Sequence, residues 1–242
     1  LFTAIGAGTV TLTANSAGDS NYYAASTSQL ITIGKATPIL TITSGNMMNV
    51  DEVLYVTEVA NASHSIGTLS YSVSNNTGAA IIDSSLGIVT SISAGSVTVT
   101  VTSSGNEDYN PVTAEQSIII GMSTPTLTIT SSNTLDVDGT LSATVVTSAT
   151  FGRGGAISYE ITSGSGSATV DAASGLITGI GSGTVTLVAS SAGDADYSAS
   201  TVSQELTIVQ ATPTLTITSS NSLSVDGTLS ATVVTSATFG RG

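Results

Sequence analysis

The chain has 242 residues, no cysteine and no tryptophan, and its 16 acidic residues against 3 basic ones give a formal net charge of -13. Because this charge repels phosphate groups, we expect no nucleic-acid partner. The lack of cysteine excludes a disulfide framework and thiol catalysis, and since no apolar run reaches the ~20 residues of a transmembrane helix, we expect no direct membrane insertion.

The chain repeats itself with a period of 87 to 88 residues, since the segment that begins at Gly8 returns at Gly95 and again at Gly183. A second segment, residues 138–154, returns letter for letter at 226–242. The repeats therefore predict four parts in chain order. These are the C-terminal part of a module at 1–35, complete modules at 36–122 and 123–210, and the N-terminal part of a module at 211–242, so that both ends lie inside modules of a longer array.

A proline marks the start of each predicted module, at Pro38, Pro125 and Pro213. Proline is tolerated at the first residue of a strand, where no ladder hydrogen bond is lost. Only one or two residues separate each proline from the preceding predicted strand. We therefore expect short, stiff linkers and a rod-like array.

Apolar and hydroxyl residues alternate within residues 123–210, as in Leu127 and Ile129 between threonines. This period of two is typical of half-buried antiparallel strands. Together the alternating runs predict about seven strands, at 126–130, 141–146, 157–161, 168–170, 176–178, 184–187 and 206–209. Seven short strands in slightly under 90 residues, with no helical period, indicate an all-β fold of tandem seven-stranded Greek-key immunoglobulin-like β-sandwiches.

The segment TVDAASGLITGIGSGTVTLVA (169–189) resembles the signature of group 2 bacterial immunoglobulin-like domains. The following residues, 192–217, resemble repeats of giant cell-surface proteins of the Bacteroidetes, including gliding-motility adhesins. The resemblance implies an extracellular fibre on the bacterial cell surface, whose partners are neighbouring modules of the same chain and other copies in a fibre. Module 36–122 departs from the signature at 82–87 and at Pro111, where we expect an irregular edge strand.

The function indicated is the stalk or filament of a bacterial cell-surface adhesin, and not an enzyme. The alternative is a set of glycan-binding or accessory modules of a secreted enzyme or phage tail protein, with a surface polysaccharide as partner. Aromatic residues, the usual platforms for sugars, make up only 4% of the chain, which favours the stalk.

No residue is predicted to be catalytic or to bind a cofactor. The only histidine, His64, falls in a predicted loop, whereas triad chemistry needs a base held between a nucleophile and an orienting acid. Asp136 and Asp138 are expected to be solvated residues beside a turn. The glycine-rich loop around Arg153 is expected to be flexible, because no helix follows it to complete an anion site.

One polar turn recurs in the three copies of the repeat and carries two hypotheses. In the first, the leading Asp or Asn bonds its own backbone as an Asx turn while the following tyrosine covers the end of the sandwich. In the second, less favoured hypothesis, the turn binds calcium, which prefers oxygen ligands. Its ligands would come from Asp194, Asp196, Asp19, Asn21, Glu107 and Asp108.

Overall fold

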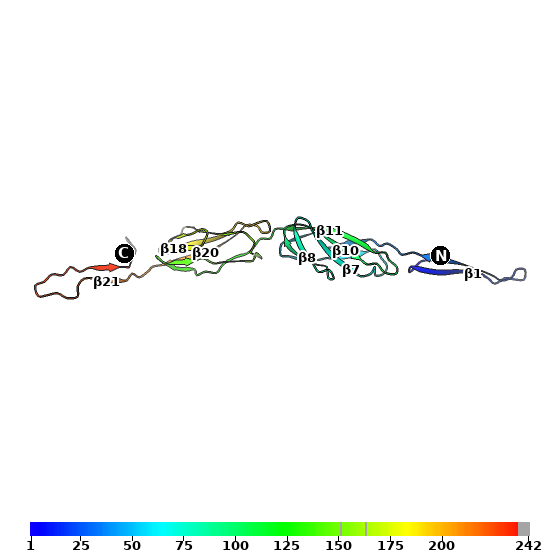
Figure 1. The fold of residues 1–242 in the computed structure, drawn as a ribbon, viewed down its shortest axis with the longest axis horizontal. Coiled ribbons are helices and arrows are strands. Elements are labelled where there is room, and N and C mark those ends of the chain that lie inside the picture. Colours follow the sequence, from blue (N-terminus) through cyan, green and yellow to red (C-terminus); the bar gives the residue numbers. More distant parts are fainter. Residues whose placement is uncertain (151, 163, 237–242) are drawn as a thin grey trace. The chain divides into compact units, whose positions relative to one another are not determined.

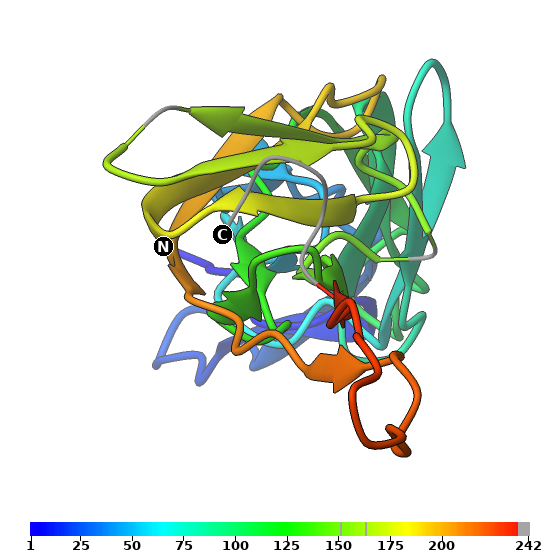
Figure 2. The ribbon, with the colours of Figure 1, turned by 90° about the vertical axis from the view of Figure 1, so that its left-hand side faces the viewer.

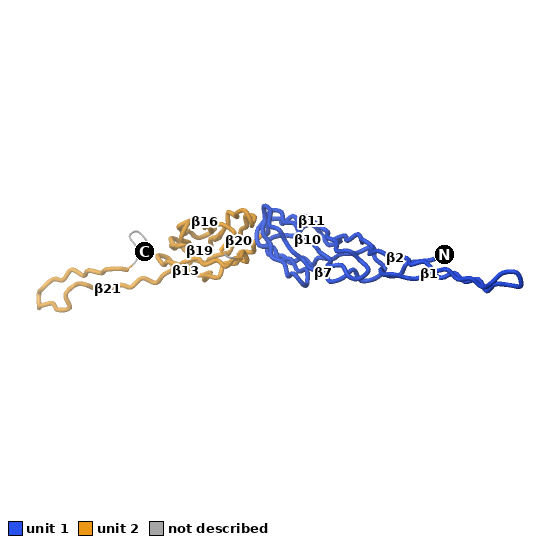
Figure 3. The backbone as a smooth tube through the Cα atoms, turned by 45° about the vertical axis from the view of Figure 1, so that its right-hand side comes forward, with its two compact units in different colours: residues 1–123 blue, residues 124–242 orange. Residues whose placement is uncertain are grey.

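The computed structural model describes residues 1–150, 152–162 and 164–236, which belong to two compact units, 1–123 and 124–242 (Figure 3). All regular structure in these ranges is β-strand, and Figure 1 follows the strands along the chain from β1 in blue. Within the same ranges, no helix is long and apolar enough to cross a membrane.

The first unit begins with a hairpin of two strands, β1 (Gly8–Ser16) and β2 (Ala25–Ile33). They pair antiparallel over their whole length, with Gly8 opposite Ile33 and Ser16 opposite Ala25. This hairpin corresponds to the last two strands of each complete module.

The complete module 36–122 packs a four-stranded sheet, in the order β4-β11-β10-β7, against a three-stranded sheet β5-β9-β8 and the pair β3-β6. Its strands are β3 (Leu40–Ile42), β4 (Met47–Asn49), β5 (Val53–Tyr55), β6 (Glu58–Ala60), β7 (Leu69–Asn75), β8 (Ala79–Ile82), β9 (Ile88–Ser93), β10 (Gly95–Ser103) and β11 (Val112–Gly121).

Module 123–210 has the same arrangement, with sheets β13-β20-β19-β16 and β14-β18-β17 and the pair β12-β15. Its strands are β12 (Leu127–Ile129), β13 (Thr134–Asp136), β14 (Thr140–Ser142), β15 (Val145–Thr147), β16 (Ile157–Thr162), β17 (Ser167–Val170), β18 (Leu176–Gly181), β19 (Gly183–Ser191) and β20 (Ser200–Val209). The two complete copies of the repeat thus share one topology.

Within residues 211–236, the last segment forms two short strands, β21 (Leu215–Ile217) and β22 (Val233–Thr235), which pair as β12 and β15 do. Figure 2 shows it in orange and red as an open loop between two arrows. The predicted partial module at 211–242 extends into residues 237–242, which lie outside the described residues, as do Phe239 and Arg241 of the repeated loop.

The core of each complete module lies between its sheets. Val185 and Leu187 of β19 are buried against Leu206 and Ile208 of β20, in one cluster with Leu135 of β13. The intervening threonines of β19 are more exposed than their apolar neighbours. The predicted period of two and the immunoglobulin-like β-sandwich class are therefore confirmed.

The strand count differs from the prediction, since residues 123–210, as far as they are described, contain nine strands and not seven. The predicted run 141–146 is divided, because β14 pairs with β18 in one sheet whereas β15 pairs with β12. The run at 134–136 was not predicted as a strand. It pairs with β20 and is followed by a turn in which Asp138 has a positive φ of 62°. Alternation alone does not reveal this strand.

The irregular edge strand expected in module 36–122 is found beside residues 82–87 but not after Pro111. The edge strand β8 shifts register against β9 between Ala79 and Ala80, and β17 of module 123–210 has the equivalent shift, so this irregularity is common to both modules. Strand β11 begins directly after Pro111 and pairs with β10 from Val112 to Ile120 without a register shift. The turn at 82–87 also matches the signature turn, because Asp83 Oδ1 accepts the N–H groups of Ser85 and Leu86 (both 2.9 Å). The departure in sequence does not change the backbone.

Candidate functional site

The recurring polar turn is an Asx turn in all three copies. Asp194 Oδ1 accepts the backbone N–H groups of Asp196 (2.8 Å) and Tyr197 (2.9 Å). The leading residues of the other two turns, Asp19 and Asn106, accept the equivalent pairs of N–H groups at 2.7 to 2.9 Å. The Asx hypothesis is confirmed, and it explains why either Asp or Asn serves at this position: both have an acceptor oxygen at Oδ1.

The tyrosine that follows the turn closes the end of the sandwich in both complete modules. Tyr197 is only 2% exposed, and its hydroxyl accepts the N–H of Thr150 (3.0 Å). Tyr109 accepts the N–H of Ser63 (3.2 Å) through its hydroxyl in the same way. Buried tyrosines usually find such a partner for the hydroxyl, and the predicted covering role of the ring is confirmed.

In module 123–210 the turn is tied to the loop around Arg153. The Arg153 guanidinium forms a 2.9 Å ion pair with Asp196, and Asp194 Oδ2 accepts the N–H of Gly154 (2.7 Å). The hydrogen bond from Gly154, then that from Asp196, holds the pKa of Asp194 below its usual value. This loop, expected to be flexible, is thus bonded to the turn through charged groups; Phe151 within it lies outside the described residues.

In module 36–122 the turn holds the chain that enters the module. Ala36 donates its N–H to the carbonyl of Asp108 (2.9 Å) and accepts the N–H of Asn110 (2.8 Å). The ammonium of Lys35 donates to the carbonyl of Asn106 (2.6 Å). We call these contacts, together with a hydrogen bond from the Ala7 N–H to Asp108 Oδ1, the junction clasp.

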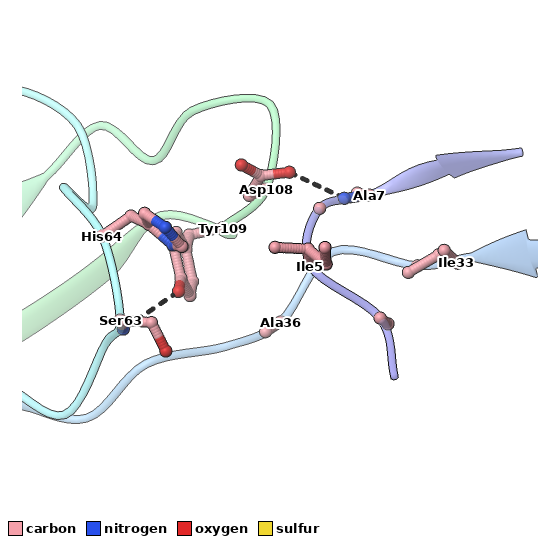
Figure 4. Close-up of a pocket in the computed structure, with 11 residues that line it drawn as sticks. Ile5, Ala7, Ile33, Ala36, Ser63, His64, Asp108 and Tyr109 are labelled. Carbon is pink, nitrogen blue, oxygen red and sulfur yellow. Dashed lines mark hydrogen bonds between the residues drawn. The ribbon is translucent and has the colours of Figure 1, made fainter. Parts of the chain in front are cut away.

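The clasp also reaches the hairpin. Asp108 Oδ1 accepts the N–H of Ala7 at 2.6 Å, as Figure 4 shows. The same oxygen lies 2.9 Å from the place where a Cβ on Gly6 would stand, so a side chain there would collide with the carboxylate. The clasp therefore fixes both the loop before β1 and the linker after β2 to one turn.

A hollow of about 210 Å³ lies beside the clasp. Ile5 and Ile33 line it from the hairpin, and His64 and Tyr109 line it from the module (Figure 4). His64 is exposed, in the loop after β6. Asp136 and Asp138, in the second unit, are exposed on and beside β13, as predicted.

The carboxylates proposed for calcium are gathered in pairs by the turns, but their oxygens are directed at donors. Both oxygens of Asp194 accept N–H groups, Asp196 is paired with Arg153, and Asp108 Oδ1 bonds to Ala7. Calcium needs six to eight oxygen ligands, and no group of three acidic, His or Cys side chains suited to a metal occurs among residues 1–150, 152–162 and 164–236. The turns do not present a calcium cage, and calcium dependence stays a prediction.

Sequence reasoning missed the clasp. It singled out Asp108, but as a metal ligand, and it did not connect this residue with Lys35 or Ala7. The sequence did contain a signal for the clasp, because every repeat has both the polar turn and a short linker that ends in proline.

No family model matches the chain, and no curated protein matches it. Among solved structures, the chain is similar to the fibronectin(III)-like modules of Clostridium thermocellum CbhA, with 12% identity and a TM-score of 0.27 over 71% of this chain and 95% of that one. It is also similar to human CDH23 EC21-23, with 16% identity and a TM-score of 0.33 over 79% and 71% of the two chains.

A third similar structure is a C-terminal 282-residue fragment of intimin in complex with the intimin-binding domain of the translocated intimin receptor. The identity is 16% and the TM-score 0.29, over 73% of this chain and 65% of that one. At TM-scores this low, the fold class stands on the strand order given above, and these likenesses carry no argument about what the chain binds.

Proposed function

We propose that this chain is a structural repeat region that carries tension in the stalk or filament of a bacterial cell-surface adhesin, of the kind used in gliding motility. The role is mechanical, with no catalytic step. The surface chemistry supports an exposed, extracellular setting, because three basic residues in 242 leave few cleavage points for trypsin-like proteases.

The observation that carries the proposal is a parallel strand pair in the four-stranded sheet of each module. An edge strand from the start of the module, β4 or β13, pairs there with the last strand of the module, β11 or β20. In module 36–122, Met48 of β4 lies opposite Ile120 of β11, and in module 123–210, Leu135 of β13 lies opposite Ile208 of β20. Tension between the two ends of a module pulls these parallel strands in opposite directions. The hydrogen bonds between them run across the strands and therefore share the load.

Backbone bonds beyond the ladder lengthen this shear contact. In module 123–210, Val137 donates to the carbonyl of Val209 (3.0 Å) and Thr207 donates to the carbonyl of Asn133 (2.8 Å). In module 36–122 the same positions are bonded, since Val50 donates to Gly121 (3.0 Å) and Ile119 donates to Asn46 (2.9 Å). Both modules thus resist extension by the same contact.

The junction clasp supports the proposal from outside the module. Lys35 and Ala36 bond the linker to the turn, and Ala7 bonds the hairpin loop to the same turn. Tension that arrives through the hairpin must break these bonds before it can extend the linker. The clasp therefore protects the connection between repeats.

Single-molecule pulling on the whole chain tests the mechanical role. We expect two unfolding events, one for each complete module. The variant Val137→Pro removes the N–H that bonds to Val209. Proline suits this position, because it is the second residue of a turn closed by a hydrogen bond from the Gly139 N–H to the Asp136 carbonyl. The expected result is a lower unfolding force for module 123–210 only, with module 36–122 as internal control. An unchanged force would contradict the proposed load path.

Immunoelectron microscopy of source cells tests the location. An antibody against residues 123–210 should label fibres that project from the cell surface. Label confined to the culture fluid, attached to neither cells nor filaments, would favour accessory modules of a secreted enzyme and contradict the stalk.

A further inference from the structure

The sheet β5-β9-β8 of module 36–122 has apolar side chains on the face that is turned away from the core. Val53 of β5 and Ile81 of β8 flank Thr90 of β9 in one row, and Tyr55 lies beside Ile88 in the next row. Val53, Tyr55 and Ile81 are 50%, 65% and 60% exposed. The residues between these positions are more buried, and since alternate residues of a strand point to opposite faces, the exposed side chains share the outer face.

The turn between β8 and β9 adds another apolar side chain beside these rows. Leu86 is 64% exposed, and its N–H donates to Asp83 Oδ1 at 2.9 Å. The turn adjoins the row of Tyr55, because Asp83 donates its own N–H to the carbonyl of Ile88 (2.9 Å). The term apolar face is used below for the set Val53, Tyr55, Ile81, Leu86 and Ile88.

Module 123–210 has hydroxyl side chains at four of the five equivalent positions. In the matching register of its sheet β14-β18-β17, the first four residues of the apolar face are replaced, in the same order, by Thr140, Ser142, Thr169 and Ser174. The last segment likewise has Thr228 and Ser230 at the first two positions. The central, core-facing residue of β5 and of β14 is leucine in both modules. The apolar face therefore belongs to module 36–122 alone among these copies, and the fold does not require it.

Carboxylates flank the apolar face at both ends. Beside the row of Val53, Glu52 is exposed and accepts the N–H of Asn49 (2.7 Å), which holds it at the start of β5. Beside the row of Tyr55, Asp83 is exposed in the turn before β9. Module 36–122 contains neither lysine nor arginine, so the field around the apolar face is negative.

We propose that the apolar face of module 36–122 binds a protein partner whose binding segment carries apolar side chains with lysine or arginine beside them. Contiguous exposed apolar side chains with a polar rim are typical of interaction sites. Burying them supplies affinity, and the carboxylates at the two ends select a basic partner and speed its association. The inference concerns a binding surface and does not rest on the mechanical role.

Charge and side-chain type disfavour two other occupants. A second copy of the chain would bring the same carboxylates together, and only three basic residues in the chain could offset them. A glycan would meet mainly aliphatic side chains, with Tyr55 as the one aromatic ring of the apolar face. A basic protein segment with apolar side chains matches both the charge and the apolar character.

Isothermal titration calorimetry of the whole chain tests the proposal with a synthetic peptide of alternating lysine and leucine. In a strand this peptide presents its leucines on one side. We expect it to bind, and we expect no binding by matched peptides that have serine for leucine or glutamate for lysine. No binding by the lysine-leucine peptide would overturn the proposal, as would equal binding by the lysine-serine peptide, which would show attraction by charge alone.

A double variant with a matched control locates the site. Tyr55→Ser combined with Ile81→Thr installs the residues of module 123–210 and should raise the dissociation constant of the lysine-leucine peptide at least ~10-fold. Val59→Thr is the control, because Val59 is 58% exposed on β6, which pairs with β3 outside this sheet. It should bind like the unchanged chain, and circular dichroism checks that each variant is folded. Equal affinities of the double variant and the control would overturn the assignment.

Two further measurements cover the other occupants. Sedimentation velocity should show a monomer of 23.8 kDa, and self-association that the double variant abolishes would identify a second copy as the occupant. Titration with the neutral oligosaccharide cellohexaose should give no heat, and binding that is lost in Tyr55→Ser would identify a glycan. Either result would overturn the basic protein partner.

Discussion

The hairpin β1-β2 and its counterpart β19-β20 have similar strand sequences and the same register, with Gly8 opposite Ile33 in one and Gly183 opposite Ile208 in the other. Both close their polar turns with the same Asx hydrogen bonds. What differs is burial, because only β19-β20 lies beneath a second sheet. Register and turn are thus local properties of the segment.

Burial, in contrast, depends on the rest of the module. Leu12 is 52% exposed and Leu187 is 1% exposed, while Tyr22 is 77% exposed and Tyr197 is 2% exposed. An identical substitution in the two copies therefore separates what a residue contributes within its hairpin from what it contributes to the sandwich.

The largest difference is expected for leucine. Leu187→Ala removes a fully buried side chain and should lower the free energy of unfolding of module 123–210 by about 2 to 5 kcal/mol. Leu12→Ala should leave the unfolding of both complete modules unchanged, since Leu12 is half exposed in the hairpin. Urea unfolding measures both variants. Equal effects of the two substitutions would contradict the conclusion that burial of this leucine depends on the rest of the module.

The tyrosine hydroxyl gives a smaller difference. Tyr197→Phe leaves the N–H of Thr150 without the acceptor that now lies 3.0 Å away, and the expected loss is about 1 to 2 kcal/mol. Tyr22→Phe is the matched control and should have no effect on the same transition. If Tyr197→Phe also has none, the hydroxyl does not stabilise the end of the sandwich.

The pH dependence of the polar turn sharpens the comparison between modules. Hydrogen bonds from Gly154 and Asp196 hold the pKa of Asp194 below 3.8 in the folded state. A carboxyl group with a lowered folded-state pKa stabilises the fold above its unfolded pKa, and this contribution disappears as the pH falls through the folded value. We expect the melting midpoint of module 123–210 to drop below about pH 4.

The variant Asp194→Asn tests whether Asp194 causes this pH dependence. Asparagine suits the turn, because Asn106 occupies the same position in module 36–122 with the same Oδ1 contacts. The variant should be less stable than the unchanged chain at pH 7, and the difference should shrink as the pH falls below 3.8. Calorimetry from pH 7 to pH 2 follows both modules. A difference that stays constant with pH would assign the effect to another group.

The sequence predicted the local features of the fold and missed the non-local ones. Alternation around Val185 and Leu187 predicted the long strands, and the Asp-x-Asp-Tyr pattern predicted the Asx turn, because both depend on neighbouring residues. The strand at 134–136 was missed, since its partner β20 lies about 70 residues away in the sequence.

The clasp was missed for a similar reason. Two of its bonds join backbone groups only, which every residue type has. The other two use the side chains of Lys35 and Asp108, but they join positions 71 and 101 apart in the sequence. The Arg153–Asp196 ion pair was missed because it joins positions 43 apart in the sequence. Residue types indicated which turn was polar, but only the folded chain shows what that turn holds.

Calcium should produce the smallest effect of all. In module 123–210 the turn oxygens already accept N–H groups or pair with Arg153, and a cation would have to displace these donors. We therefore expect the same calorimetric melting midpoint in excess calcium and in excess chelator. A higher midpoint in calcium, lost in Asp196→Asn, would show that the cation replaces Arg153 as the partner of that carboxylate. The hairpin turn at Asp19 would then be the weaker site, because it has Asn21 in place of Asp196 and therefore one carboxylate fewer.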